Sequence, residues 1–487
     1  MTGVELILLL PLIVLSGAAV AVMLAIAVRR NYLAAFLLTL LGFVLTIMAV
    51  ALSPGGPQRN VTALFVFDDF ARFFIGLITG AGLFVAVLAF DYFRQQRGQF
   101  EEFFIMLLGA TFGCAVLVAS RHFASLFLGL EILSVSLYAM IAYSRDREIS
   151  TEAGLKYLIL AGVSAAFLVF GMALVYAQTG ALEFSRMPYI TASPDEPLDI
   201  IVLAGFGMII VGIGFKLALV PFHLWTPDVY QGAPAPVTAF IATASKGAVF
   251  ALLLRLFAQT DVAFYPPLYV TFVILAIASM LFGSWLALLQ NNMKRILAYS
   301  SIAHLGFLLV AFMGRGHIQS TAAAFYLTAY FVTTLGAFGI VSLLSPGERD
   351  AEWIEDYRGL FWRRPFVAVV FSVMIFSLAG IPLTGGFVGK VLVILAGEQA
   401  AQWALVVVLV TASAISLFYY VRVVGIMYMP AEAGGADRPA LPGLSLQGGG
   451  ALACLTGLLV LLGVYPGPFL DLVRDMVTTV YAGVLPR

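Results

Sequence analysis

Apolar segments long enough to cross a membrane recur along the whole chain. Cutting the sequence at charged and Pro/Gly-rich breaks leaves about fourteen of them, each close to the ~20 residues that span hydrocarbon. They lie near residues 4–28, 32–52, 73–90, 103–119, 123–143, 155–177, 200–220, 237–258, 266–289, 296–313, 319–344, 366–395, 401–428 and 449–470. The sequence therefore predicts an all-α, polytopic membrane protein in which residues 1–487 form a single membrane domain.

Composition agrees with this fold class. The chain is 62% hydrophobic and 11% charged, whereas soluble domains carry about 25% charged residues. A formal net charge of zero provides no basic field for nucleic acid. The two cysteines, Cys114 and Cys454, lie inside apolar runs and suggest buried packing rather than a disulfide or a metal site.

The connectors predict how the chain is oriented. No basic residue precedes the first segment, which is also too long for the apolar core of a signal peptide, so we expect a transmembrane helix that begins outside. Arg29 and Arg30 follow it, and the other connectors assigned to the inner side also hold most of the basic residues, among them Arg145, Lys294 and Arg295. This asymmetry obeys the positive-inside rule and places both termini on the outer side.

Lysine is used sparingly and in unusual places. The chain has five lysines among 26 basic residues: Lys156, Lys216, Lys246, Lys294 and Lys390. Lys294 is expected in a loop, whereas the other four lie in or at the ends of apolar segments. A buried lysine can release its proton and an arginine cannot. Lys216, Lys246 and Lys390 are therefore candidate proton carriers, and Lys156, one turn into its helix, is a secondary candidate.

Three further titratable residues lie in the apolar part of the chain. Glu131 is central in the fifth segment, and because its own helix holds no basic residue, we expect its partner on another helix. An ion pair that merely joins two helices is the alternative. His304 is central in the tenth segment and titrates near physiological pH, so we expect it in a relay. For His223, in a proline-rich connector, a structural role is favoured over a relay role.

Two segments are interrupted in comparable ways. Pro221, Pro227, Pro234 and Pro236 follow Lys216, and Pro382 with a Gly-Gly pair precedes Lys390. Paired interruptions of this kind are typical of transporters built from repeats. The spacing predicts two five-helix repeats at residues 103–258 and 266–428, with flanking helices at 1–100 and 449–487.

Three runs of sequence carry a resemblance to a known family. GFKLALVPFHLWTPDVYQGAPAPVTAF, KRILAYSSIAHLGF and AGIPLTGGFVGK resemble the antiporter-like subunits of the proton-pumping NADH:quinone oxidoreductase (respiratory complex I), and most of all its N-type subunits. The likeness is strong over about residues 65–430. Lysine at position 390 departs from the glutamate typical of M-type subunits, and we expect no long lateral helix of the L type after the fourteenth segment.

The resemblance implies inverted repeats and specific roles. Glu131 would pair with Lys216, Lys246 would be the central relay, His304 would connect the repeats and Lys390 would exchange protons with the far side. Proton pumping would be driven by quinone reduction in neighbouring subunits, so NADH, flavin, iron–sulfur clusters and quinone would be bound elsewhere. The sequence shows no pattern for a cofactor or metal on this chain.

The resemblance also implies partners and a location. The neighbours would be the antiporter-like M subunit and the small K and J subunits, in a bacterial inner (plasma) membrane. Two alternatives stay open: a D-type subunit of a multisubunit sodium/proton antiporter, and a membrane scaffold in which the lysines only join helices.

Overall fold

The protein is almost entirely helical. The computed structural model describes residues 3–56, 59–96, 98–187, 199–260, 265–314, 316–345, 349–430 and 445–481. Within these ranges, 12 helices are long and apolar enough to cross a membrane, and α4 and α15 are shorter apolar helices of 17 and 15 residues. The predicted all-α, polytopic membrane fold is confirmed. The last residues of the predicted C-terminal flank, 482–487, lie outside the described part.

The first half of the chain runs from α1 to α10. It contains α1 (Gly3–Val28), α2 (Tyr32–Leu52), β1 (Arg59–Asn60), β2 (Val66–Phe67), α3 (Asp69–Arg94), α4 (Glu102–Val118), α5 (Phe123–Ile141), α6 (Glu148–Thr179), η1 (Phe184–Arg186), α7 (Ile200–Leu217), α8 (Trp225–Gly232), α9 (Ala235–Phe240), the π turn η3 (Ile241–Ser245) and α10 (Lys246–Thr260). The strands β1 and β2 pair antiparallel in one short ribbon.

The second half runs from α11 to the C-terminus. It contains α11 (Pro266–Leu288), α12 (Met293–Phe312), α13 (His317–Leu344), η5 (Ile354–Tyr357), α14 (Leu360–Arg363), α15 (Pro365–Ala379), α16 (Gly385–Gln399), α17 (Trp403–Tyr428), α18 (Leu446–Val464) and α19 (Gly467–Tyr481). Each predicted apolar segment corresponds to a helix or to a broken pair of helices. The amphipathic α19 was not predicted as a separate element.

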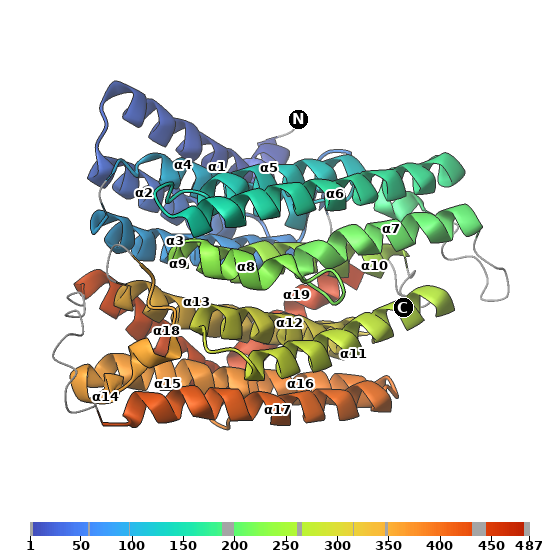
Figure 1. The fold of residues 1–487 in the computed structure, drawn as a ribbon. Coiled ribbons are helices and arrows are strands. Elements are labelled where there is room, and N and C mark those ends of the chain that lie inside the picture. The colour runs from blue at the N-terminus through green and yellow to red at the C-terminus, as the bar shows by residue number, and fades with distance from the viewer. Residues whose placement is uncertain are drawn as a thin grey trace.

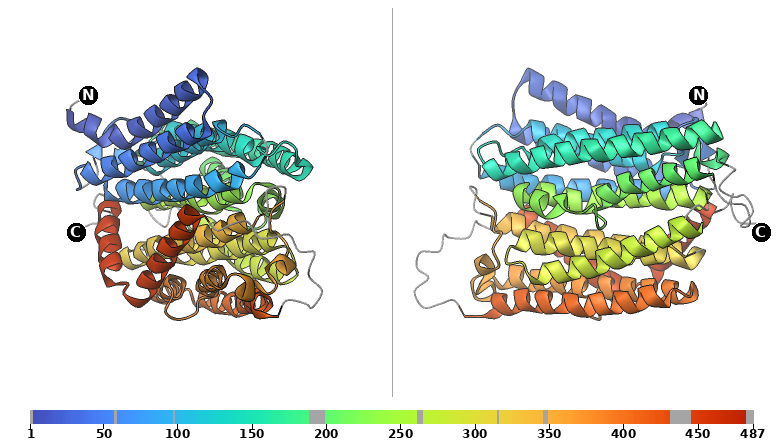
Figure 2. Two further views of the ribbon diagram at one scale, coloured as in Figure 1. Left: turned by 90° about the vertical axis from the view of Figure 1, so that its left-hand side faces the viewer. Right: turned by 45° about the vertical axis from the view of Figure 1, so that its right-hand side comes forward.

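The two halves lie side by side as layers of roughly parallel helices (Figure 1). The helices α18 and α19 return along one side and bridge the layers (Figure 2, left). Accordingly, α19 contacts α3, α10 and α13, and α18 contacts α3, α13 and α16. The chain therefore closes on itself, with its last two helices fastening the first half to the second.

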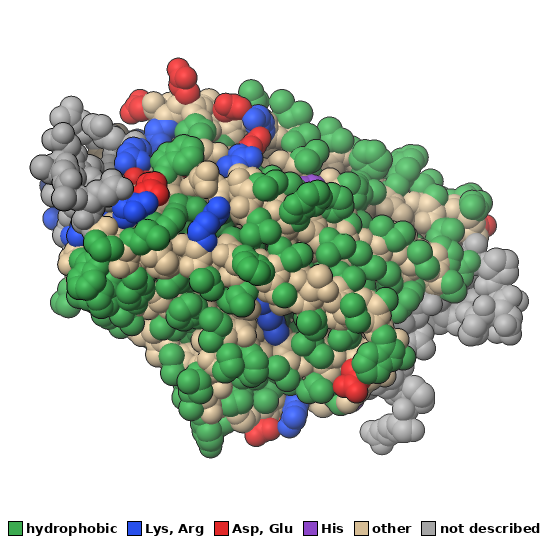
Figure 3. Space-filling model, turned by 60° about the horizontal axis from the view of Figure 1, so that its bottom comes forward, with side chains coloured by type: hydrophobic (Ala, Val, Ile, Leu, Met, Phe, Trp, Pro, Cys, Tyr) green, Lys and Arg blue, Asp and Glu red, His purple; other side chains and the backbone are tan. Residues whose placement is uncertain are grey.

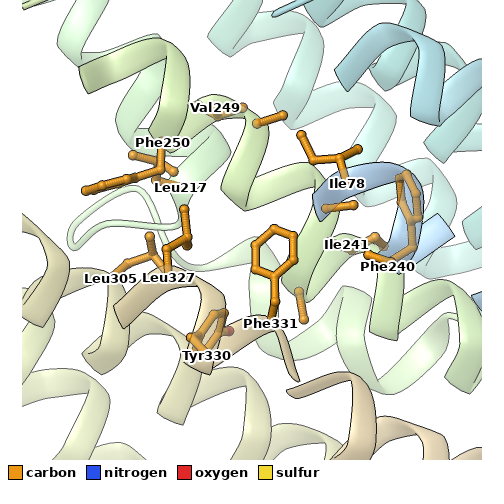
Figure 4. Packing of buried hydrophobic residues seen from close by; sticks show 14 of the residues in the cluster. Ile78, Leu217, Phe240, Ile241, Val249, Phe250, Leu305, Leu327, Tyr330 and Phe331 are labelled. Atoms are coloured by element: carbon orange, nitrogen blue, oxygen red, sulfur yellow. The ribbon is translucent and has the colours of Figure 1, made fainter. Parts of the chain in front are cut away.

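Burial separates central helices from peripheral ones. The span from Ala235 to Ala258 is 100% buried and α13 is 94% buried, whereas α1 is only 28% buried. Large apolar side chains such as Phe331, Phe240 and Phe250 fill the space between the halves (Figure 4). On the outside, apolar side chains cover most of the face in Figure 3, and charged ones gather mainly at one end. This distribution suits a chain whose outer surface meets lipid.

Connectors that were predicted to share a side meet in the structure. On the predicted outer side, residue 65 bridges to residue 120, and residue 122 bridges to residue 183, which joins the α2–α3, α4–α5 and α6–α7 connectors. On the predicted inner side, residue 292 bridges to residue 353. The contacts agree with the predicted alternation of crossings.

Candidate functional site

Lys216 lies where the seventh span is interrupted. It occupies the last turn of α7 and is 4% exposed. Ala218 ends the helix in the left-handed conformation, with φ 61°, and residues 218–224 connect it to α8. The Lys216 ammonium donates to Ser134 Oγ on α5 at 2.7 Å, and the Tyr157 ring lies 5.2 Å from its nitrogen. The predicted break therefore places a buried lysine against α5.

The predicted pairing of Lys216 with Glu131 is replaced by a looser arrangement. Glu131 lies less than one turn before Ser134 on α5. Its carboxylate interacts electrostatically with the Lys216 ammonium. Yet among the described residues Lys216 forms no ion pair, and the buried Glu131 Oε1 finds no hydrogen-bond partner there. The neutral Ser134 hydroxyl is the group that receives the lysine. The right pair of helices was predicted, but not the contact.

Lys246 lies at the centre of the molecule. It follows the π turn Ile241–Ser245 and is 1% exposed. Its ammonium donates to Ser301 Oγ on α12 at 2.7 Å, and Tyr330 OH on α13 donates to the same oxygen at 2.8 Å. The Tyr230 ring lies 5.3 Å from the lysine nitrogen. π turns often occur at functional sites, and here the turn precedes a lysine bound only to a hydroxyl among the described side chains.

His304 connects the centre to the second half. Ser301 and His304 are close on one face of α12, because residues three apart on a helix are neighbours. His304 Nδ1 lies 2.6 Å from Tyr326 OH and its Nε2 lies 3.4 Å from Tyr420 OH. Tyr420 OH is in turn bonded to Ser300 Oγ. The histidine thus sits in a network of hydroxyl groups that can each donate or accept a proton.

Lys390 caps the second broken helix. It lies in α16, is 6% exposed, and donates to Leu378 O at 3.0 Å and to Ala379 O at 2.9 Å. These carbonyls end α15, where the helix dipole favours a cation. Gly380 then turns the chain with φ 84°. The predicted break before Lys390 is confirmed, and it supplies the backbone oxygens that the lysine binds.

The two secondary candidates lie in different environments. Lys156 is 45% exposed by side chain and pairs with Glu152 at 2.7 Å and with Asp228 at 3.1 Å; exposed pairs of this kind contribute about 0–1 kcal/mol. His223 is 8% exposed, interacts electrostatically with Lys246, and its Nδ1 has no hydrogen-bond partner in the described part of the chain. Of the two, only His223 is buried.

Lys294 is not the loop residue that was expected. It lies in the first turn of α12 and is 0% exposed. Its ammonium is bound by Asp350 Oδ2 at 2.5 Å and by two backbone carbonyls. The expectation was wrong because a basic pair after a polar stretch is typical of a connector. The acid that pairs with the buried Lys294 is 56 residues away in the sequence.

Several hydroxyl groups in the site were missed. Ser300 and Ser301 stand beside His304 in the run AYSSIAH, and their spacing alone places them on the histidine's side of the helix. Tyr326 and Tyr330 are four residues apart on α13, a spacing that also favours one face. Tyr420 lies far along the chain in α17, and nothing in the local sequence separates it from an ordinary aromatic residue of a membrane helix.

Comparisons with known proteins agree with this geometry. The family described as "NADH:quinone oxidoreductase/Mrp antiporter, TM" matches residues 120–416, more than half of the chain. The NADH-quinone oxidoreductase subunit N of Ectopseudomonas mendocina is 46% identical over 482 residues, 97% of either chain. The subunit of the same name from Nitrosospira multiformis is 49% identical over 486 residues, 97% of this chain and 96% of that one.

Solved structures add the fold. A chain of respiratory complex I from Thermus thermophilus with bound aureothin superposes with a TM-score of 0.80 at 32% identity, covering 95% of this chain and 98% of that chain. A chain of the Mrp complex from Dietzia gives a TM-score of 0.84 at 21% identity, covering 99% and 98%, which shows likeness of fold alone. Because the relatives nearly half identical to it cover almost its whole length, the chain belongs to the subunit N family of NADH-quinone oxidoreductase.

Proposed function

We propose that this chain translocates protons across the membrane as a subunit of NADH-quinone oxidoreductase, through Lys216, Lys246, His304 and Lys390, with Glu131 acting beside Lys216. One observation carries the proposal. Within the described residues, the ammonium groups of Lys216, Lys246 and Lys390 bind only neutral oxygens: Ser134 Oγ, Ser301 Oγ and the carbonyls that end α15.

Neutral acceptors matter because they leave the lysine free to change charge. A carboxylate partner favours the charged form of a lysine, whereas burial disfavours it. If such a partner were present, deprotonation would also leave a buried carboxylate unpaired, which is costly. A lysine held by hydroxyl or carbonyl oxygens carries no such penalty. The arrangement therefore suits proton carriers better than a scaffold joined by ion pairs.

The intervening network supplies steps between the lysines. From Lys246 the hydrogen bonds continue through Ser301 to Tyr330, and His304 lies on the same face of α12 with Tyr326 and Tyr420 as partners. Hydroxyl and imidazole groups can pass a proton by donating and accepting in turn. Phe307 lies next to both His304 and Lys390, with its ring 5.4 Å from the His304 ring and 5.2 Å from the Lys390 nitrogen. Lys156, on an exposed face, is left outside this route.

The architecture we propose has two inverted five-helix repeats at residues 103–258 and 266–428. Each contains one interrupted span with a buried lysine beside the interruption. The membrane is then a bacterial inner (plasma) membrane with both termini on its outer side, and the neighbours are the M, K and J subunits of the complex. The sodium/proton antiporter alternative is less supported, since the Mrp likeness extends to the fold only.

The redox chemistry of the complex is proposed to lie in other subunits, which would bind NADH, flavin, iron–sulfur clusters and quinone. Among the described residues no group of three or more His, Cys, Asp or Glu side chains is placed to hold a metal ion. The two free cysteines differ: Cys114 in α4 is buried as predicted, whereas Cys454 in α18 is exposed, so the prediction of buried packing is wrong for Cys454. What this chain would contribute is the movement of protons.

The test replaces Lys246 in the assembled complex. Inverted membrane vesicles from cells whose only copy of the chain carries Lys246→Ala are assayed for NADH oxidation and for proton uptake with a pH-sensitive dye. We expect the ratio of proton uptake to NADH oxidation to fall while native gels show normal assembly. The exposed Lys156→Ala is the matched control and should retain the ratio. Normal pumping by assembled Lys246→Ala would refute the relay.

A further inference from the structure

A second charged cluster is buried at the predicted inner end of the molecule, away from the relay groups. Asp350, in the connector after α13, is 0% exposed. It binds Lys294 at 2.5 Å, Tyr92 OH of α3 at 2.6 Å and Arg147, which precedes α6, at 3.3 Å. Arg147 also donates to Tyr92 OH at 3.0 Å. One carboxylate thus joins elements from both halves of the chain.

Lys294 extends this cluster to the interruption between α8 and α9. Its ammonium donates to Gln231 O at 2.9 Å and to Ala233 O at 2.6 Å, besides Asp350. An ammonium has three protons to donate, and here it has three acceptors. All three ammonium protons are therefore hydrogen-bonded, one to the Asp350 carboxylate and two to carbonyls at the helix interruption.

Carbonyl groups at the interruption need side-chain donors, because prolines remove N–H groups that would bind carbonyls in a regular helix. Pro234 and Pro236 lack N–H groups, so the carbonyls one turn earlier have no helical partner. Side chains replace these bonds: Thr238 Oγ1 donates to Tyr230 O at 3.2 Å, and Ser150 Oγ donates to Gly232 O at 2.7 Å. Lys294 donates to Gln231 O and shares Ala233 O with Thr238 Oγ1, so it serves two further carbonyls of the same interruption. Buried backbone groups left unpaired would be costly.

The interruption in turn begins the helix that carries Lys246. The elements α9, η3 and α10 follow it without a gap, and Lys246 comes directly after η3. On α12, Lys294 and Ser301 are seven residues apart, about two turns and on one face. One face of α12 therefore makes both contacts. Lys294 binds the carbonyls where this helix begins, and Ser301 binds the Lys246 ammonium.

We propose that Asp350 and Lys294 are positioning residues for Lys246: the buried ion pair fixes the break between α8 and α9, and so the register of the helix that presents Lys246 to Ser301. The proposal rests on the proton relay proposed above. Asp350 acts through Lys294 and carries no proton itself.

The charge state of Asp350 supports a fixed role. Burial alone would raise the pKa of its carboxyl, but the Lys294 ammonium and the Arg147 guanidinium lower that pKa below its usual range. The usual value is about 3.9, so the carboxylate is ionised at neutral pH. A group that keeps one charge across the working range can hold its neighbours in place but cannot relay protons.

The test uses Asp350→Asn, which keeps the shape and the acceptor for Tyr92 but removes the charge. In assembled complex in inverted vesicles, we expect the ratio of proton uptake to NADH oxidation to fall to about a tenth, as when a positioning group is lost. Asp350→Glu should restore part of it. Glu355→Gln, at an exposed acid of the same connector, is the control and should leave the ratio unchanged.

Three comparisons separate positioning from other roles. In the double variant Asp350→Asn/Lys294→Gln, which keeps neither titratable partner, the loss should be the same fraction at every pH from about 6 to 8.5; a loss that varied with pH there would overturn the positioning role. Lys294→Gln should lower pumping similarly, and the double variant should be no worse than either single one, because the two residues act as a unit. If Asp350→Asn does not assemble, Lys294→Gln decides: its normal pumping would refute the proposal.

The relay proposal and the proposed positioning role of Asp350 and Lys294 can be refuted separately. If assembled Lys246→Ala pumps normally, the proposed relay is wrong whatever Asp350 does. If Lys246→Ala stops pumping but assembled Asp350→Asn pumps as the unsubstituted complex does, the relay stands and the positioning role of Asp350 is refuted.

Discussion

Gly380, which follows α15, offers a direct test of whether the position of Lys390 matters. Its φ of 84° is unfavourable for other residues, so Gly380→Ala should cost about 1–2 kcal/mol in the backbone alone. A Cβ here would also lie 2.8 Å from Lys390 Cδ and 3.2 Å from its nitrogen. The lysine must then move away from the two carbonyls that end α15. Each lost bond from a charged donor is worth about 1.5–3 kcal/mol.

The chain provides a matched control for the backbone term. Gly180 ends α6 in the same way, with φ 65°, and a Cβ there meets nothing within 4 Å. Gly180→Ala should therefore show the backbone penalty without disturbing any lysine. The two variants differ in the contact with Lys390 and not in the kind of turn that is strained.

The assay is the ratio of proton uptake to NADH oxidation in inverted vesicles, with native gels to measure assembly. We expect Gly380→Ala to lower the ratio about tenfold or more, since a displacement of about 1 Å at a reacting group can cost a hundredfold. Gly180→Ala should keep the ratio. If both variants assemble and pump equally well, the position of Lys390 against the carbonyls that end α15 does not matter for proton pumping, and the reasoning is wrong.

Two further substitutions test the interior. Arg255→Met breaks a bidentate pair with Asp68 whose nitrogen–oxygen distances are 2.8 Å and whose side chains are both 0% exposed; it should lower assembled complex on native gels, because an uncompensated buried charge costs about 3–5 kcal/mol, whereas the exposed Arg474→Met should assemble normally. Tyr330→Phe removes the second donor to Ser301 Oγ and should lower pumping about twofold to tenfold, on the order of one ordinary hydrogen bond of about 0.5–1.5 kcal/mol; unchanged pumping would place Tyr330 outside the relay.

The fold was largely predictable because the membrane restricts the choices. Apolar segments of about 20 residues must be helices in lipid, and prolines and glycines marked the breaks after Lys216 and before Lys390. The buried lysines were also found, since a charge in an apolar segment needs a reason. The periodicity of apolar residues does not predict the register between neighbouring helices. It could not decide that Lys216 meets Ser134 rather than Glu131, which is less than one turn away on α5.

Long-range pairs were the main failure. Asp350 lies in a polar connector and Lys294 beside an arginine, so both resemble solvated loop residues. Only the folded chain shows that the connector turns inward and buries them. Likewise, Arg255 lies inside the predicted apolar segment 237–258, but its partner Asp68 is 187 residues away. Such pairs depend on tertiary contacts that a single sequence does not reveal.

Two classes of buried cation emerge among the described residues, and they differ in their partners. Arg255 and Lys294, both fully buried, are paired with the carboxylates of Asp68 and Asp350, and the partly buried Arg147 also pairs with Asp350. The proposed carriers have hydroxyl or carbonyl partners instead. A fixed cation is satisfied by a fixed anion, whereas a carrier must exist in both charge states. The chemistry of the partner, rather than burial alone, then distinguishes structural cations from carriers.

This distinction predicts that a carboxylate placed beside Lys246 should stop the relay. Ser301→Asp converts the 2.7 Å acceptor of Lys246 into an anion that favours the charged lysine. Ser301→Asn adds nearly the same volume without charge and is the control. We expect both variants to assemble, the Asn variant to retain most of its pumping, and the Asp variant to lose at least about tenfold, equivalent to about 1.4 kcal/mol. Equal pumping by the two would show that the charge of the partner is irrelevant, and the distinction between structural cations and carriers would fall.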